Sequence, residues 1–141
     1  MIKLEEIEKV KLSKLDIEVV PFLKIDDVAY IGKQVMTRMD YAERKLLKEM
    51  LILEKCTDIK DLENQDYDAL KYNGVIDAVL AVVRNAGEID EYVAHQESFN
   101  IEVGAFLQEL IKLCEKAVKK IPTGKKWDEI MNMIPQLINK K

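Results

Sequence analysis

The sequence predicts an all-α protein: a compact bundle of five to six helices with a short extended, β-like segment at the N-terminus. Gly and Pro are scarce, at 5 and 3 of 141 residues, whereas sandwiches and barrels need many tight turns. From residue 25 onward apolar residues recur every three or four positions, the spacing of a helix with one buried face. We therefore expect a single domain over residues 1–141, with residues 1–24 extended and residues 25–141 forming the helical core.

The extended segment is predicted from apolar residues at every second position, the pattern of a strand. They form two short runs with charged residues between them: Val10 and Leu12, then Leu15, Ile17 and Val19. Pro21 ends this pattern. A lone hairpin is marginal in water, so its partner is either the helices of the same chain or another subunit.

Two helices are predicted next. Asp26 and Asp27 supply the N-cap and first-turn charge of a short helix with an apolar face. A capping box over residues 40–43 begins a second helix that is apolar on most sides. We expect this second helix to be central and largely buried, and to end near residues 56–58.

An acidic connection over residues 58–68 leads to the next helices. We interpret Gly74 as a left-handed residue that ends one helix, and residues 75–83 as a short helix packed on all sides. A polar helical segment follows over residues 88–98. Ser98 or Asn100 is then expected to cap the longest helix, whose apolar stripe predicts a core position: Val103, Leu107, Leu110, Cys114, Ala117 and Ile121.

A last helix is predicted after Pro122, capped by Thr123 and bent at Pro135. Its apolar residues recur at helical spacing: Trp127, Ile130, Met131, Ile134 and Ile138.

The residues that could carry chemistry are few, so we expect no enzyme, no metal and no cofactor. His95 is the only histidine and lies in a polar segment, which indicates an exposed side chain. Cys114 lies in the apolar stripe and is expected to be an inert core thiol, and Cys56 lies near a helix end, where the dipole disfavours the thiolate. The loop over residues 123–126 lacks the first Gly and the final hydroxyl of a phosphate-binding loop.

Charge is unevenly distributed along a chain with a net charge of −4. Residues 54–68 and 88–102 are acidic, and residues 116–141 are basic. This pattern is typical of charged side chains that face solvent. It also permits head-to-tail self-association, in which the basic face of one copy meets the acidic face of the next. The candidate partner-binding residues are therefore Asp58, Asp61, Glu63, Asp66 and Asp68 on the acidic side, and Lys119, Lys120, Lys125, Lys126 and Trp127 on the basic side.

The net charge argues against nucleic acid as a partner, because nucleic-acid binding needs a basic surface. The charged N-terminus lacks the apolar core of a signal peptide, and no apolar run is long enough to cross a membrane. We expect a location in a host cytoplasm or a virion only because of the following resemblance.

Three stretches carry that resemblance: residues 20–23 (VPFL), 54–59 (EKCTDI) and 67–77 (YDALKYNGVID). In this order, over residues 17–140, the chain resembles small, mostly uncharacterised helical proteins that are encoded by tailed phages and prophages of Gram-positive bacteria. The resemblance implies a viral context and brings no catalytic residues with it.

The sequence thus predicts a non-enzymatic phage protein that acts through protein–protein contacts, as a connector-like or chaperone-like accessory in the virion or its assembly. Its partner would be a phage structural protein or a host protein, with a homo-oligomer also possible. The alternative is a phage inhibitor of a host enzyme or defence complex, which would use the acidic surface. A DNA-binding regulator and an enzyme rank below these two, because neither a recognition helix nor a carboxylate pair stands out.

Overall fold

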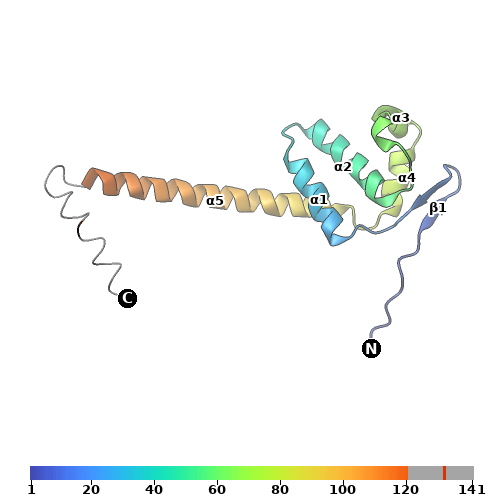
Figure 1. Ribbon diagram of the computed structural model, residues 1–141, viewed down its shortest axis with the longest axis horizontal. Coiled ribbons are helices and arrows are strands. Elements are labelled where there is room, and N and C mark those ends of the chain that lie inside the picture. The colour runs from blue at the N-terminus through green and yellow to red at the C-terminus, as the bar shows by residue number, and fades with distance from the viewer. Residues whose placement is uncertain (121–131, 133–141) are drawn as a thin grey trace. The chain divides into compact units, whose positions relative to one another are not determined.

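The computed structural model describes residues 1–120 and residue 132. Five α-helices follow a small N-terminal two-stranded hairpin in this part of the chain (Figure 1), so the predicted helical fold is confirmed. The elements are β1 (Val10–Leu12), β2 (Ile17–Val19), α1 (Ile25–Met36), α2 (Tyr41–Cys56), a 3-10 helix η1 (Leu62–Asn64), α3 (Tyr67–Tyr72), α4 (Val75–Val82) and α5 (Gly87–Lys120).

The chain divides into two compact units, unit 1 over Met1–Ser98 and unit 2 over Phe99–Lys141. Unit 1 contains every element up to α4 and the first turns of α5. The described part of unit 2 is the rest of α5 and residue 132. The expectation of a single domain over residues 1–141 stays a prediction.

The N-terminal hairpin is held by the chain's own helices. β1 pairs antiparallel with β2, with Val10 opposite Val19. On its other side Val19 forms a β-bridge with Thr57, and the Val20 N–H donates to the Cys56 carbonyl at 2.7 Å. The question that the sequence left open, whether this segment pairs within the chain, is thereby answered.

Helices α1 and α2 begin differently. α1 follows Lys24, whose side chain makes no capping hydrogen bond, and Asp26 and Asp27 lie inside the first turn. The predicted first-turn charge is confirmed, and the predicted aspartate N-cap is wrong. α2 begins as predicted, because an Asp40 carboxylate oxygen accepts from the backbone N–H groups of residues 42 and 43 at 2.9 and 3.1 Å.

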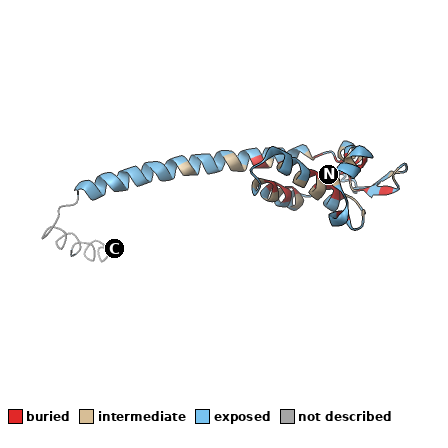
Figure 2. Ribbon diagram, turned by 90° about the horizontal axis from the view of Figure 1, so that it is seen from above, coloured by how far each residue is buried: buried red, intermediate tan, exposed pale blue. Residues whose placement is uncertain are grey.

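The core of unit 1 is apolar and draws on β2, α1, α2, α4 and the start of α5 (Figure 2). One face of the second half of α2 is buried, whereas Leu46 near its start is exposed, so α2 is less buried than predicted. Gly74 separates α3 from α4 with φ of +72°, which confirms the predicted left-handed glycine. The fully buried side chains include Val19, Leu23, Val28, Ile31, Ile52, Leu53, Ile76, Val79 and Ile89.

Asn85 joins the segment before α1 to the start of α5. Its Oδ1 accepts from the Leu23 N–H at 2.8 Å, and its Nδ2 donates to the Leu23 carbonyl at 2.9 Å and to Glu88 at 3.1 Å. The side chain is buried, with a residue exposure of 8%. A buried amide with all these partners fixes two distant parts of the chain, because losing any partner leaves a polar group unsatisfied.

Close packing also fixes α5 against α1 within unit 1. A Cβ at Gly32 would lie 2.3 Å from Cδ1 of Tyr92, closer than two carbon atoms can approach. Only glycine therefore lets the Tyr92 ring lie against α1 at this point.

Helix α5 corrects one predicted boundary. The sequence predicts a polar helical segment and then a new helix capped by Ser98 or Asn100. The structure has one continuous helix, in which both residues are internal. Ser and Asn favour caps but are tolerated inside a helix when their side chains face solvent, as both do here. The last predicted helix, with Thr123 and Trp127, lies outside the described residues.

Candidate functional site

The second part of α5 carries a row of exposed apolar side chains, which we call the α5 apolar face. Its members are Phe99, Val103, Phe106, Leu107, Leu110, Ile111, Leu113, Cys114 and Val118. The exposed fraction reaches 64% at Phe106 and 65% at Val118. The prediction that this stripe forms a core is therefore wrong for the described residues. Helical periodicity specifies an apolar face, but it does not specify what covers that face.

The face is wide because apolar residues occupy four of the seven heptad positions. With Leu107 and Cys114 at position a, and Val103 and Leu110 at position d, the flanking e and g positions are also mostly apolar. The remaining b, c and f positions are mostly polar or charged, namely Glu102, Gln108, Glu109, Lys112, Glu115, Lys116 and Lys119. A charged back and an apolar front are typical of a helix that packs against other helices.

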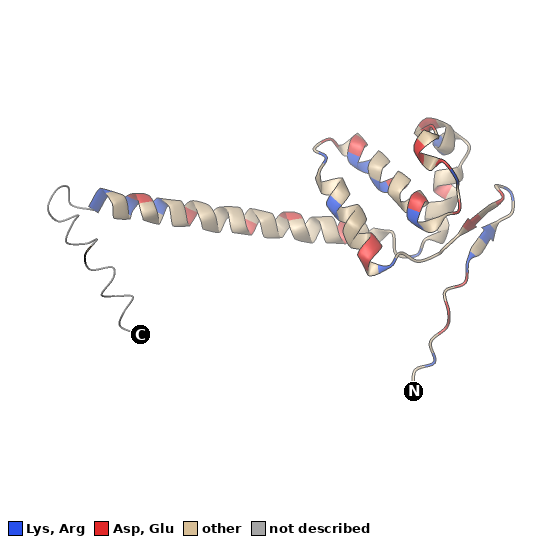
Figure 3. Ribbon diagram, viewed as in Figure 1, with Lys and Arg blue, Asp and Glu red and all other residues tan. Residues whose placement is uncertain are grey.

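Charge on this part of α5 changes sign along its length. Residues 99–110 contain two acidic residues and no basic residue, whereas residues 111–120 contain four lysines and one glutamate. The final turns accordingly carry the lysines of the helix (Figure 3). Lysines near a helix C-terminus are also favoured by the helix dipole.

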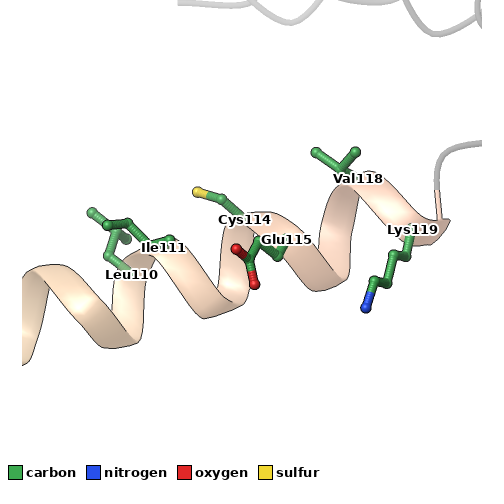
Figure 4. A pocket seen from close by; sticks show the side chains of 6 residues that line it. All are labelled: Leu110, Ile111, Cys114, Glu115, Val118 and Lys119. Atoms are coloured by element: carbon green, nitrogen blue, oxygen red, sulfur yellow. The ribbon is translucent and has the colours of Figure 1, made fainter.

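An apolar hollow lies beside the C-terminal half of the face. Among its lining residues are Leu110, Ile111, Cys114 and Val118, with Glu115 and Lys119. Figure 4 shows the Cys114 and Val118 side chains on one side of the helix and the Lys119 side chain extending to the other. The hollow thus presents mainly hydrocarbon and one thiol, which suits a hydrophobic side chain from a partner.

The two cysteines occupy opposite environments, and only Cys114 differs from the expectation. Cys114, the expected core thiol, is exposed, whereas Cys56 is buried at the end of α2. Burial, with the nearby Asp27 charge, raises the pKa of the Cys56 thiol to about 11. Cys56 therefore stays protonated and unreactive near neutral pH.

The five predicted acidic residues lie in unit 1, and two of them have local structural roles. An Asp58 carboxylate oxygen accepts from the Glu18 N–H of β2 at 3.0 Å. Asp66 is the N-cap of α3 and accepts from the Asp68 N–H at 3.2 Å. Asp61 and Glu63 are exposed at η1, where Asp61 adopts a left-handed backbone with φ of 53°.

The predicted basic residues lie in unit 2. Lys119 and Lys120 are exposed in the last turn of α5. The other three, Lys125, Lys126 and Trp127, lie outside the described residues.

A polar cluster that the sequence analysis missed joins α2, α3 and α4 in unit 1. The Tyr67 hydroxyl donates to the buried carboxylate of Glu49 at 2.6 Å. The Lys71 ammonium lies 3.8 Å from the same carboxylate and 2.7 Å from Asp77. Burial and the Glu49 hydrogen bond raise the pKa of Tyr67 to about 12. The phenol thus remains a proton donor near neutral pH, and the cluster holds three helices together.

A small cleft between α2 and the first turns of α5 is closed by ion pairs. Arg44 lies 2.8 Å from Glu97, and Lys48 lies 3.0 Å from Asp90. The cleft has a volume of about 310 Å³. These two ion pairs join α2 to the first turns of α5 across the cleft. No sequence signal pairs these residues, since each pair is separated by more than forty positions.

Within residues 1–120, no three His, Cys, Asp or Glu side chains come together in a way that could hold a metal ion. No helix of the described chain combines the length and apolar character needed to cross a bilayer. His95 is exposed, as expected.

Comparisons with protein-family models, curated proteins and solved structures gave no match to this chain. The proposed function is therefore based on the geometry of α5 and of unit 1.

Proposed function

We propose that this chain is a non-enzymatic phage protein that acts through protein–protein contacts, as an accessory subunit of a virion or of its assembly. The observation that carries the proposal is the α5 apolar face, with nine members exposed to solvent along about three heptads. The phage context comes from the sequence resemblance over residues 17–140.

The energetics of the face support a contact role. Full burial of a large apolar side chain stabilises a protein or complex by about 1.5–3 kcal/mol. Phe99 and Phe106 are aromatic, and aromatic residues are enriched at the centres of interfaces. A partner that covers this row removes from water a surface that costs free energy when it is left exposed.

The acidic surface supports the alternative, an inhibitor of a host enzyme, less well. Asp58 and Asp66 already accept backbone hydrogen bonds within unit 1. A surface that mimics nucleic acid works better with carboxylates that are free to meet a basic channel. The proposal therefore places the contact on α5.

The test is a pull-down of the tagged full-length chain from phage-producing cells, followed by mass spectrometry. We expect a phage head or tail structural protein to co-purify with the wild type. Leu107→Glu places a charge in the middle of the face and should reduce recovery at least about tenfold. Gln108→Glu adds the same group on the polar side and should leave recovery unchanged. Recovery of a host enzyme in place of any structural protein, independent of Leu107, would contradict the proposal and favour the inhibitor.

A further inference from the structure

We propose that the α5 apolar face of one copy packs antiparallel against the same face of a second copy, so that the protein forms a symmetric dimer. This inference rests on the proposed function, because it names the first partner of the same face. The phage structural protein would then bind the paired α5 helices of the dimer.

The heptad pattern supports another helix of the same kind as the partner. The a and d residues Leu107, Leu110 and Cys114 form an exposed seam with Val103 that spans about 17 Å. A seam of this kind is buried when side chains of a second helix fill the spaces between its own. A second copy supplies a seam of identical length and composition.

The net charge of the two halves favours one orientation through long-range attraction, because these charged residues lie on the polar side of the helix and not in the seam. The acidic first half of the stretch, with Glu102 and Glu109, and the lysine-rich second half have opposite signs. An antiparallel partner places each acidic half beside a basic half, twice in one dimer. A parallel partner brings the two lysine-rich halves to the same end of the dimer, where their net charges repel each other at a distance. Charge complementarity therefore favours the antiparallel arrangement.

The pattern also fixes a register. Antiparallel seams stack an a residue on a d residue, so Leu107 meets Leu110 of the second copy. Continuing outward in the same register, Val103 meets Cys114 of the second copy. At the flanks, Phe106 comes beside Leu113 of the second copy, which covers side chains that are 64% and 61% exposed in the single chain. This register uses the full length of the face and satisfies two-fold symmetry.

The first measurement is the native mass of the full-length chain by size exclusion with light scattering across a concentration series. We expect a dimer for the wild type and for Gln108→Glu, and a monomer for Leu107→Glu. The dissociation constant of the Leu107→Glu dimer should rise at least about a hundredfold. Unchanged circular dichroism and thermal unfolding of unit 1 would show that this variant is folded. Raising the salt from about 50 mM to about 500 mM should weaken the wild-type dimer about tenfold.

The second measurement is disulfide cross-linking, for which Cys114 is a natural reporter. Disulfides form only between cysteines whose Cα atoms lie within about 7 Å. Val103→Cys should therefore cross-link to Cys114 of the second copy on mild oxidation, while the wild type should not cross-link through Cys114. Cys56 is buried and does not interfere.

A wild-type cross-link through Cys114, with no gain from Val103→Cys, would indicate a parallel dimer and overturn the proposal. A monomer at every concentration would overturn it as well, and slow modification of Cys114 in that monomer would show that another part of the same chain covers the face. Neither result contradicts the proposed function if a phage structural protein still co-purifies. A dimer that recovers no structural protein would instead contradict the proposed function alone.

Discussion

Two stretches of the same helix behave in opposite ways. In the first turns of α5, Ile89 and Val93 are buried in the core of unit 1. In its later turns, equally apolar residues such as Leu107 and Leu110 are 49% and 45% exposed. The helix is continuous and amphipathic throughout. The difference teaches that the apolar spacing of a helix determines its faces, whereas the burial of each face depends on neighbours that lie elsewhere.

The strongest contrast between the two stretches should appear on truncating a leucine in each region. Leu53 is fully buried in α2, so Leu53→Ala should lower the free energy of unfolding by about 2–5 kcal/mol. Leu113 is 61% exposed, so Leu113→Ala should change it by less than about 0.5 kcal/mol. Urea unfolding of dilute protein measures both. A large loss from Leu113→Ala in dilute protein would mean that the chain itself covers this side chain.

The two thiols give a second contrast. In dilute native protein, Cys114 should react with a thiol reagent at least about a hundredfold faster than Cys56, because Cys114 is exposed and Cys56 is buried with a pKa of about 11. A colorimetric thiol assay on the Cys56→Ala and Cys114→Ala variants assigns the two phases. Raising the protein concentration should slow the Cys114 phase if α5 dimerises, and a rate independent of concentration would argue against the dimer.

The same glycine substitution should have opposite effects in the two regions. Gly32→Ala places a methyl group against the ring of Tyr92 and should destabilise unit 1 by about 1–3 kcal/mol. A Cβ at Gly104 meets nothing within 4 Å, so Gly104→Ala should stabilise α5 by up to about 1 kcal/mol. Thermal unfolding followed by circular dichroism measures both changes. In a Tyr92→Ala background the cost of Gly32→Ala should largely vanish, and its persistence would contradict the close contact as the cause.

The smallest effect concerns pH and is confined to unit 1. The pKa of Tyr67 is raised in the folded state from 10 to about 12, so the unfolded chain loses this proton first. The associated stability is complete below pH 10 and disappears as the pH rises towards 12. Tyr67→Phe should therefore flatten the decline in stability over this range, as measured by urea unfolding at several pH values. Tyr72→Phe, at an exposed tyrosine, should retain the wild-type slope.

Local signals predicted most of the fold of unit 1. The side chain of Asp40 begins α2 and the positive φ of Gly74 precedes α4, and both effects act within a few residues. The pairs that fasten unit 1 were not predictable, because Asn85 binds Leu23 across 62 positions and no short-range pattern marks such a pair. For α5, the periodicity predicted helical structure and the apolar stripe correctly, but it did not predict that residues 88–98 belong to the same helix. The exposure of that stripe could not be predicted, because burial is a property of surroundings that the stripe does not encode.

The hydrogen bonds between the Asn85 side chain and the Leu23 backbone also have a consequence for the synthesis of the chain. Leu23 leaves the ribosome long before Asn85 does, so the Leu23 backbone has no Asn85 side chain to bond until α1 to α4 have been made. By the time Val93 emerges, every buried residue of unit 1 is available to complete its core. The turns that carry the α5 apolar face are synthesised afterwards. The core of unit 1 can therefore form before the exposed apolar residues of α5 are synthesised.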